Sequence, residues 1–343
     1  MSPMSVSAAP TFYVIPGTAV KTAIDRNRRQ VFDAIETAYR LHADGAAINP
    51  DSYFLRYPDK PRARIIALPA HLGSTVQKSG IKWIASFPDN IAANLARASA
   101  VLILNDATTG YPVACLEGSL ISATRTAVSA ALAAENISAT PFEASLAVIG
   151  TGLIARTTVE WLLYRNWKFP EIRLFDLDRA ESQRFADWLH DDHGLSAAIA
   201  DGLEGAVSGA SLIVFTTTTG EPYLADEKLF AHAPTVLHLS LRDICENVIL
   251  ASQNIVDDVD HCLKANTSLH LTEQRTGNRD FIAGTLVDVL DKRIALEPKG
   301  ARIFSPFGLG VLDIALGNLA YERAVASGTA IAVPDFFSNS ARW

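Results

Sequence analysis

The alternation of hydrophobic and polar residues is typical of β-strands in the first third of the chain. Apolar residues occur there in short runs bounded by Pro, Gly, Asp or Asn, but one stretch, 28–42, repeats Val31, Ile35 and Tyr39 at helical spacing. An Ala-rich run over 119–136 predicts a further helix. The predicted strands are 11–15, 52–57, 64–68, 80–85, 100–104 and 111–116.

From Ser145 onward the pattern changes to strands that alternate with helices. Residues 146–149 form a continuous apolar run, which is expected of a parallel strand covered on both faces, and a helical pattern follows it. This order predicts a doubly wound parallel sheet. A last helix over 309–326 is expected to return to the first domain. Further strands are predicted at 172–175, 211–215, 236–239, 255–256 and 302–304.

The strongest local motif is Gly150-Thr151-Gly152-Leu153-Ile154-Ala155, a GxGxxA between a predicted strand and a predicted helix. Gly150 permits a tight turn, Gly152 lets the backbone approach a pyrophosphate, and Ala155 allows the helix to pack closely on the strand. The positive end of the helix then faces the phosphates. A Gly-rich turn that binds nothing is the alternative.

Two further polar positions fit a dinucleotide site. Asp176 ends the next predicted strand, where a carboxylate accepts hydrogen bonds from both ribose hydroxyls and repels a 2′-phosphate, which favours NAD over NADP. Thr216 and Thr217 follow another predicted strand, where such folds line the cofactor; a merely polar strand end is the alternative. Leu153 and Ile154 belong to the same predicted cofactor-binding set through their backbone.

The fold class that we predict is therefore α/β, with a Rossmann-type doubly wound sheet and a second, β-rich domain. The β-rich domain comprises residues 1–125 and is completed by 306–343, and the Rossmann-type domain comprises 126–305. A chain of 343 residues exceeds what a single hydrophobic core usually supports, which favours this division.

Three cationic residues are candidates for binding an anion. Lys82 lies inside an apolar strand, and a buried ammonium needs an anionic partner, either a structural carboxylate or a substrate. Arg125 lies on an otherwise apolar helix, where it either forms a salt bridge that ties the helix to the first domain or clamps a substrate carboxylate. Arg56, near the end of a strand, is a weaker candidate of the same kind.

Asp243 is the candidate acid–base residue. It follows the predicted strand 236–239, and parallel strands present their C-terminal ends to the ligand crevice. The alternative is that its side chain caps the following helical turn.

Composition and charge exclude several classes of function. The chain carries 37 acidic against 30 basic residues, a net charge of −7, which argues against nucleic acid or an anionic membrane as the partner. No apolar run reaches the length of a bilayer span, and the N-terminal residues lack the pattern of a signal peptide. The three cysteines have neither disulfide nor zinc spacing. We expect a cytoplasmic protein without a metal site.

Taken with these motifs, the order of segments resembles the ornithine cyclodeaminase/mu-crystallin family over nearly the whole chain, from about 11 to 326. The segments Ser122-Ala123-Thr124-Arg125-Thr126-Ala127, Asp106-Ala107-Thr108-Thr109-Gly110 and Gly308-Leu309-Gly310 are similar to family segments. The resemblance implies that Lys82 and Arg125 hold the substrate carboxylate, that Asp243 performs the acid–base step, and that the β-rich domain forms a homodimer.

Within the family, the sequence departs from the ornithine cyclodeaminase pattern. The usual Gly-Ala-Asp-x-Pro-Gly-Lys run is replaced by Leu241-Arg242-Asp243-Ile244-Cys245-Glu246-Asn247. The segments around Lys82, Asp243 and Thr272 are instead similar to the branch of N-(2-amino-2-carboxyethyl)-L-glutamate dehydrogenases, which serve 2,3-diaminopropionate and siderophore biosynthesis. This resemblance implies an NAD-dependent amino-acid dehydrogenase that acts on a C–N bond.

The alternatives are an ornithine cyclodeaminase, a ketimine or opine-type reductase, and a non-catalytic protein that binds a ligand with NAD(H). The presence of Lys82, Arg125 and Asp243 together argues against the last of these.

Overall fold

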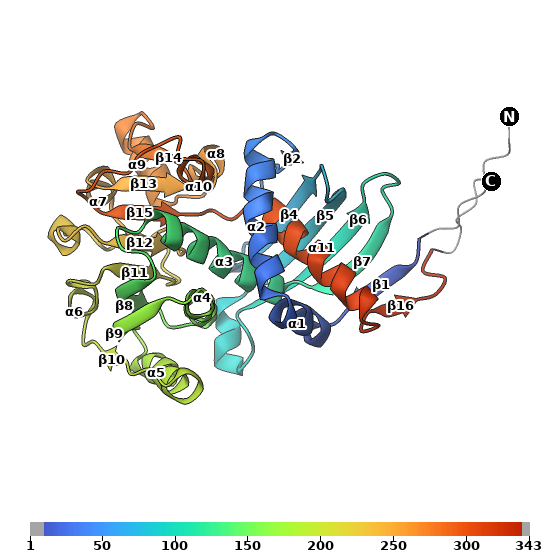
Figure 1. Cartoon of the computed structure of the whole chain (residues 1–343), viewed down its shortest axis with the longest axis horizontal. Helices are drawn as coiled ribbons and strands as arrows, with labels where there is room; N and C mark the ends of the chain where they lie inside the picture. The colour runs from blue at the N-terminus through green and yellow to red at the C-terminus, as the bar shows by residue number, and fades with distance from the viewer. Residues whose placement is uncertain (1–9, 338–343) are drawn as a thin grey trace. The chain divides into compact units, whose positions relative to one another are not determined.

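The computed structural model describes residues 10–337, and these divide into two compact units (Figure 1). Unit 1 contains residues 10–125 and 309–337, and unit 2 contains 126–308. The first boundary falls inside helix α3 (Ser119–Ile137), and the second follows Gly308, whereas the sequence predicted a return at 306. The predicted first domain also included 1–9 and 338–343, which lie outside the described residues.

Unit 1 is built on one mixed sheet. Among the described residues the sheet has eight strands in the order β16-β1-β7-β6-β5-β4-β2, with β3 paired to β4. All neighbours are antiparallel except β1 and β7. The strands are β1 (Phe12–Ile15), β2 (Ala47–Ile48), β3 (Tyr53–Tyr57), β4 (Lys60–Leu72), β5 (Lys78–Ser86), β6 (Ala98–Asp106), β7 (Pro112–Glu117) and β16 (Ile331–Val333).

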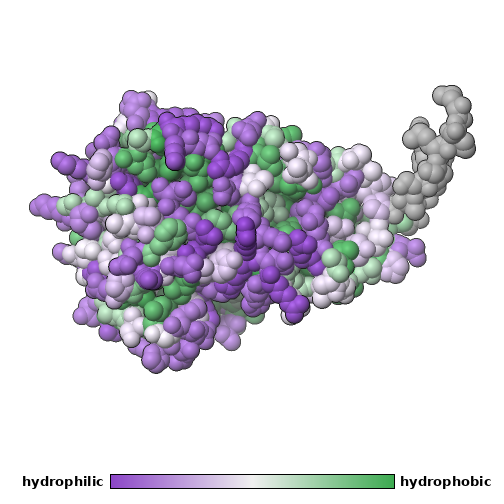
Figure 2. All heavy atoms as spheres, in the orientation of Figure 1, coloured by the Kyte–Doolittle hydropathy of each residue, from purple (hydrophilic) through white to green (hydrophobic). Residues whose placement is uncertain are grey.

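Three helices of unit 1 lie over one face of this sheet: α1 (Gly17–Arg26), α2 (Arg28–Ala43) and α11 (Gly310–Ala326) (Figure 1). Hydrophilic residues predominate where α1 and α2 form the surface (Figure 2). Helix α11 lies close to the strands because Gly317 has no side chain: a Cβ there would lie 2.1 Å from Leu102 Cδ2. Unit 1 contains this helix, which the sequence predicted to return to the first domain.

The sequence predicted a single helix before the third strand, and this was wrong, because α1 precedes α2. The backbone at Asn27 (φ −129°, ψ 30°) breaks what would otherwise be one long helix. The signal for α1 was the buried pattern Ala19, Val20, Ala23 and Ile24, which is short and follows Pro16 directly.

Unit 2 is a parallel doubly wound sheet, so the predicted α/β fold class is confirmed. Among the described residues its eight strands run in the order β10-β9-β8-β11-β12-β15-β13-β14. Strands β9 and β10 lie on one side of β8, whereas β11 and β12 lie on its other side, so the winding reverses at β8. The strands are β8 (Glu143–Ile149), β9 (Lys168–Phe175), β10 (Ala198–Ile199), β11 (Leu212–Phe215), β12 (Thr235–His238), β13 (Gln253–Val256), β14 (Ile282–Thr285) and β15 (Arg302–Ser305).

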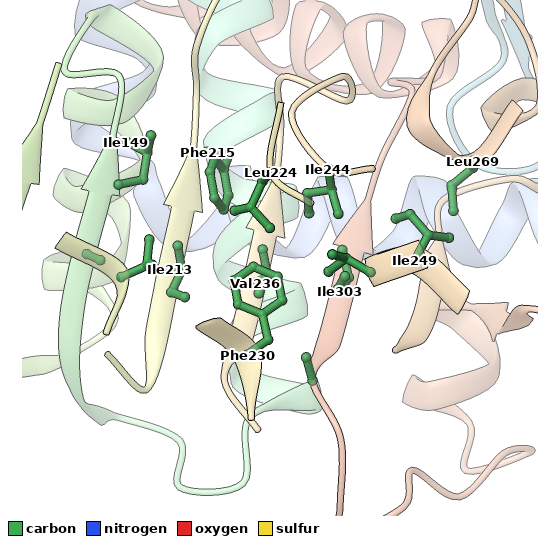
Figure 3. Packing of buried hydrophobic residues seen from close by; sticks show 14 of the residues in the cluster. Ile149, Ile213, Phe215, Leu224, Phe230, Val236, Ile244, Ile249, Leu269 and Ile303 are labelled. Carbon is green, nitrogen blue, oxygen red and sulfur yellow. The ribbon is translucent and has the colours of Figure 1, made fainter. Parts of the chain in front are cut away.

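The core of unit 2 lies between this sheet and its helices. On neighbouring strands Ile149 lies opposite Phe215 and Ile213 lies opposite Val236, and these side chains are at most 1% exposed (Figure 3). Such continuous burial explains why the strands read as apolar runs in the sequence. No helix in the described part of the chain is long and apolar enough to cross a bilayer. The helices are α4 (Leu153–Tyr164), α5 (Arg179–His193), α6 (Leu203–Val207), α7 (Glu246–Leu250), α8 (Val259–Cys262), α9 (Ser268–Thr276) and α10 (Leu286–Leu290).

Candidate active site

The loop after β8 is held between the ends of two neighbouring strands. Gly150 has φ +83°, and its amide donates to the carbonyl of Phe175 at 2.9 Å. A Cβ at Gly150 would lie 2.9 Å from the Thr217 nitrogen and the Thr216 carbonyl carbon, so only glycine fits. The hydroxyl of Thr216 donates to the Gly150 carbonyl at 2.6 Å. The structure therefore brings the Gly-rich loop and the two threonines together at the point where the winding reverses.

The N-terminus of α4 suits an anion. Gly152 is its N-cap, and no side chain caps the first turn, so the amides there keep their donor capacity for a ligand. A Cβ at Gly152 would meet nothing within 4 Å, which is the open space that a pyrophosphate needs. Ala155 is fully buried against the sheet, and Leu153 is 62% exposed. These features fit a bound dinucleotide.

Asp176 directly follows β9 and is tied to the same loop. Its Oδ2 accepts the Thr151 amide at 2.8 Å and the Thr151 hydroxyl at 3.2 Å, and its Oδ1 accepts the Asp178 amide at 3.0 Å. A half-buried carboxylate with remaining lone pairs can still accept ribose hydroxyls. Arg179, three residues after Asp176, is paired with Asp201 at 3.0 Å. The side-chain arrangement therefore fits NAD.

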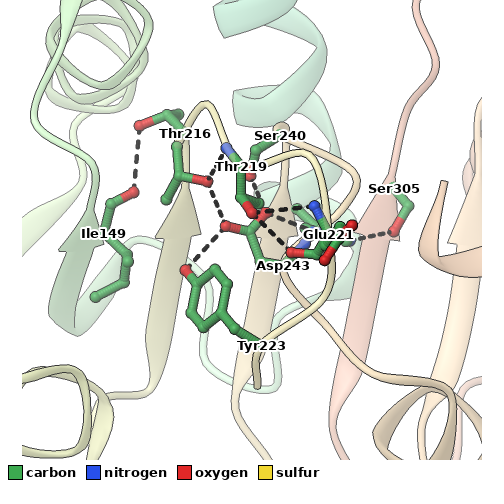
Figure 4. A network of polar contacts seen from close by, with 10 residues as sticks. Ile149, Thr216, Thr219, Glu221, Tyr223, Ser240, Asp243 and Ser305 are labelled. Carbon is green, nitrogen blue, oxygen red and sulfur yellow. Dashed lines mark hydrogen bonds and ion pairs between the residues drawn. The ribbon is translucent and has the colours of Figure 1, made fainter. Parts of the chain in front are cut away.

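Asp243 lies after β12, completely buried, at the centre of a polar network (Figure 4). Its Oδ1 accepts hydrogen bonds from the Thr217 hydroxyl at 2.5 Å and the Tyr223 hydroxyl at 2.9 Å. Its Oδ2 accepts one from the Ser240 hydroxyl. Because Thr217 also adjoins Gly150, the carboxylate lies one residue away from the loop that fits the dinucleotide, linked to it through Thr217.

His238, the last residue of β12, supports this carboxylate from within the sheet. Its Nε2 lies 3.2 Å from both the Asp243 amide nitrogen and Oδ2, and its Nδ1 lies 3.1 Å from the Ser305 hydroxyl. Nε2 accepts from the amide in one tautomer and donates to the carboxylate in the other. The His238 imidazole can therefore carry its proton on Nε2, facing Asp243, or on Nδ1, facing Ser305.

The network decides the charge of Asp243. Burial by itself raises the pKa of its carboxyl group. The hydrogen bond and charge of His238 and the hydrogen bonds from Ser240 and Thr217 outweigh burial, and they hold the pKa below its usual range. The pKa of Tyr223 is raised, first by burial and then by the charge of Asp243. At neutral pH the site therefore contains a carboxylate that accepts protons and a phenol that keeps its own.

The alternative reading of Asp243 as a helix cap is wrong. Helix α7 begins at Glu246, and its N-cap is Cys245, without a side-chain cap. Asp243 instead points into the buried network, where Thr217 and Tyr223 donate to it. Leu241, two residues earlier, adopts a left-handed conformation, φ +69°, which is uncommon for a non-glycine residue. Sequence reasoning missed Tyr223, His238 and Ser305; the one available signal was a histidine inside an apolar strand.

Unit 1 contains a second buried polar cluster around Lys82. The Lys82 ammonium is 2.6 Å from Asp313 Oδ2 and 3.1 Å from the Ser122 hydroxyl; Lys82 is 1% and Asp313 0% exposed. Burial lowers the pKa of Lys82 to about 8, although Asp313 opposes the shift and Arg125 adds to it. The anion that Lys82 was expected to meet is thus a carboxylate of the protein.

Arg125 contacts the same carboxylate from α3. Its Nε lies 3.3 Å from Asp313 Oδ1, so the salt-bridge alternative is present in the structure. The sequence predicted no role for Asp313. The signal that could have identified it was an aspartate within the apolar helix 309–326.

Arg56, the third predicted cation, lies exposed on β3. Its guanidinium is 5.1 Å from the centre of the Phe54 ring, and in the sheet register it lies opposite Arg64. As for metals, no group of three or more His, Cys, Asp or Glu residues within 10–337 is arranged to hold an ion.

The sequence of the chain is similar to one family along most of its length. The model of the ornithine cyclodeaminase/mu-crystallin family matches residues 17–328. The N-((2S)-2-amino-2-carboxyethyl)-L-glutamate dehydrogenase of Staphylococcus aureus is 30% identical over 308 residues, which cover 87% of this chain and 91% of that protein.

Solved structures share the whole fold. An archaeal alanine dehydrogenase dimer with bound NAD superposes with a TM-score of 0.84 at 22% identity, covering 95% of this chain and 100% of that one. The Δ1-pyrroline-2-carboxylate reductase of Thermococcus litoralis, in complex with NADH and L-proline, gives a TM-score of 0.85 at 19% identity, covering 94% and 99%.

Proposed function

The chain belongs to the ornithine cyclodeaminase/mu-crystallin family, and on that premise we propose that it cleaves N-(2-amino-2-carboxyethyl)-L-glutamate oxidatively, with NAD, to 2,3-diaminopropionate and 2-oxoglutarate. The observation that carries the proposal is the buried carboxylate of Asp243, hydrogen-bonded to Thr217 beside the Gly-rich loop, in a chain 30% identical to a dehydrogenase of that name. The product would serve siderophore or other secondary-metabolite biosynthesis. The three cysteines are free thiols, which supports a reducing, cytoplasmic location.

The cofactor is NAD, held by unit 2. Gly150, Gly152 and the first turn of α4 would hold the pyrophosphate, and Asp176 would accept the ribose hydroxyls. Relatives of the same fold are solved with NAD and with NADH. When bound, the nicotinamide would accept a hydride from the glutamyl α-carbon of the substrate.

Asp243 is the acid–base residue of the proposed reaction. Loss of the hydride converts the secondary amine to an imine, the nitrogen proton leaves, and water then adds to the imine carbon. Asp243 would accept a proton from the amine or from the attacking water, and would return one to the nitrogen as the C–N bond breaks. Tyr223 and His238 orient the carboxylate through their hydrogen bonds.

The substrate carries three carboxylates, and unit 1 supplies the cations. Lys82 and Arg125 already bind a carboxylate, that of Asp313, in the geometry that a substrate carboxylate would also satisfy. A guanidinium presents several donors in one plane, so Arg125 can contact two carboxylates through different N–H groups. Arg56 is assigned to the same task, as a cation at the edge of the same sheet.

The test of the reaction is the appearance of NADH. Purified protein with NAD is mixed with a panel of amines that includes the glutamate–diaminopropionate adduct, ornithine, alanine and proline. We expect NADH, measured by its absorbance, to form with the adduct alone, together with equal amounts of 2-oxoglutarate and 2,3-diaminopropionate. Turnover of ornithine without net NADH, or of an imine with consumption of NADH, would show a cyclodeaminase or a reductase instead.

NAD is expected to bind at least tenfold more tightly than NADP. The Asp176 carboxylate would repel a 2′-phosphate, and Arg179 is engaged with Asp201. In calorimetric titrations, Asp176→Asn should reduce the difference between the affinities for NAD and for NADP. The matched control is Asp178→Asn, because asparagine caps α5 as well as aspartate does. Equal affinity of the wild-type protein for both cofactors would contradict the assignment.

The face of the unit 1 sheet opposite its helices supports a homodimer. An in-register row of Tyr53, Ala67, Trp83 and Val101 crosses four strands of that face. Tyr53 is 72%, Trp83 41% and Val101 40% exposed, so the row forms an apolar patch of the kind that marks protein interfaces. We assign this patch to contact with a second copy of the chain.

Trp83→Glu is expected to convert the dimer to monomer, because the substitution places an unpaired charge at the centre of a patch that the proposed dimer would bury. Sedimentation velocity or light scattering measures the change directly. Ile91→Glu is the matched control, since Ile91 is 63% exposed but lies outside the sheet. A Trp83→Glu protein with unchanged mass in solution would exclude this face as the interface.

A further inference from the structure

Three arginines of unit 1 form a cluster that the proposed mechanism does not fully use. In the sheet register Arg56 lies opposite Arg64, Arg64 opposite Ser86, and Ser86 opposite Ala98. Arg97 directly precedes Ala98, and its carbonyl accepts the Phe87 amide at 2.8 Å. Directly opposite residues of antiparallel strands point to the same face, so Arg56, Arg64 and Ser86 share a face. The register does not include Arg97, but burial and then the charge of Arg64 lower the pKa of Arg97, so the two guanidinium groups lie near each other. We call Arg56, Arg64 and Arg97 the arginine cluster.

This face is also the one that presents Lys82. Lys82 lies opposite Leu68, and residues two apart on a strand point the same way, so Lys82 and Ser86 on β5 and Leu68 and Arg64 on β4 face the helices together. Ser86 follows Lys82 by four positions on the strand, so their Cα atoms are roughly 13 Å apart at about 3.3 Å per residue. The long arginine side chains can cover part of this separation, as an extended substrate can.

The arginine cluster has no acidic counterpart. No ion pair or hydrogen bond within residues 10–337 joins the guanidinium of Arg56, Arg64 or Arg97 to a carboxylate, although Arg64 and Arg97 are partly buried. By contrast, Arg62, two residues from Arg64, is exposed and paired with Asp89. Burial and then the charge of Arg56 lower the pKa of Arg64; burial and then the charge of Arg64 lower that of Arg97.

A second observation points to a ligand at the same place. The Ser86 hydroxyl is buried, with the residue 7% exposed, and it has no hydrogen-bond partner. A buried hydroxyl without a partner costs free energy, as do neighbouring cations without a counter-charge. Arginine does not relieve the repulsion by losing its proton, because its intrinsic pKa lies far above neutral. A bound anion would satisfy both the cations and the hydroxyl.

We propose that Arg64 and Arg97, with the Ser86 hydroxyl, form an anion subsite that binds the side-chain carboxylate of the glutamyl part of the substrate. This inference rests on the proposed function. Lys82 and Arg125 then hold an α-carboxylate, and the subsite selects substrates that carry a further carboxylate at a distance. It distinguishes the tricarboxylate from alanine, ornithine and proline, which have none there.

The test compares two substrates in two variants. Arg64→Gln and Arg97→Gln remove the charge and shorten the side chain but keep a polar amide. Arg62→Gln, which makes the same change two residues from Arg64 on β4, is the matched control. With the glutamyl adduct, kcat/KM should fall about 10- to 100-fold in both variants, the effect of losing a hydrogen-bonded charge. With an analogue that has a glutaminyl amide in place of the carboxylate, it should change less than about threefold.

Thermal stability separates binding from a structural role. Removing one positive charge from the arginine cluster reduces the repulsion between the remaining arginines. The Tm of Arg64→Gln and of Arg97→Gln should therefore stay unchanged or rise. A fall in Tm together with an equal loss of kcat/KM for both substrates would overturn the subsite and assign the arginines to the fold.

Ligand binding tests the subsite even if the proposed reaction fails. Should the adduct yield no NADH, the proposed function falls, and calorimetry with 2-oxoglutarate and 2-oxobutyrate on the NAD-loaded protein decides the subsite. Tighter binding of 2-oxoglutarate that is lost in Arg64→Gln and Arg97→Gln supports it. Equal affinity for the two oxo acids, no binding of 2-oxoglutarate, or unchanged binding in the variants overturns it.

Discussion

Asp243→Asn is expected to lower the rate constant for NADH formation by ~10²–10⁴-fold, equivalent to roughly 3–5 kcal/mol of transition-state stabilisation. Asparagine preserves the shape of the side chain but accepts no proton at neutral pH. The affinity for NAD should persist, because the Gly-rich loop is held by Phe175, Thr216 and Asp176 and not by Asp243. Single-turnover mixing with NAD and the adduct measures the rate directly.

The surroundings of Asp243 provide a graded control. Tyr223→Phe removes one hydrogen bond to Oδ1 and leaves the carboxylate, so it should reduce the rate far less than Asp243→Asn. The groups that hold the pKa of the Asp243 carboxyl low against burial are His238, Ser240 and Thr217, and all three remain, so the base stays ionised in this variant. An Asp243→Asn protein that keeps most of its activity would remove Asp243 from the mechanism.

Asp313→Asn is expected to lower the free energy of unfolding by about 3–5 kcal/mol, the cost of leaving a buried charge without its partner. Lys82 is 1% exposed, and its ammonium would then face a neutral amide, the Ser122 hydroxyl and the repelling charge of Arg125, with no counter-charge. Denaturation in urea measures the loss. A change below about 1 kcal/mol, the value typical of an exposed pair, would show that the cluster is hydrated in solution.

A double substitution isolates the ion pair. In Lys82→Met with Asp313→Leu both charges disappear and apolar groups fill the space, so much of the stability lost in Asp313→Asn should return. The same protein should bind 2-oxoglutarate poorly, because the cation assigned to the substrate is absent. Stability and binding therefore separate in this variant, which distinguishes a structural ion pair from a substrate-binding one.

The elements of unit 2 could be predicted from the sequence because their signals are local. A strand buried on both faces appears as an apolar run, as in Leu146–Ile149 within β8. The turn after it needs a residue at φ +83° that leaves room for Thr216, which only glycine provides. Asp176 stands where the next strand ends, one βαβ unit later. Spacing along the chain decides all three features.

The partners of the charged residues could not be predicted, because they depend on contacts between distant segments. Lys82 and Asp313 are 231 positions apart, and nothing near either residue indicates the other. Asp243 had two plausible roles in the sequence, and only its hydrogen bonds to the distant Thr217 and to His238 place it in the buried network and not at the start of α7. Likewise, Arg56 and Arg64 form a cluster only through the register of β3 and β4.

The sequence by itself determined the α/β class, the Gly-rich loop with Asp176, and the residue types available for acid–base and anion chemistry, because these follow from periodicity and from the conformations that single residues allow. Only the tertiary structure decided which charges meet. A charge inside a protein is stable only beside a partner, and packing, not distance along the chain, selects that partner. For this reason Lys82 pairs with Asp313, Asp243 with His238, and Arg64 with no carboxylate among residues 10–337.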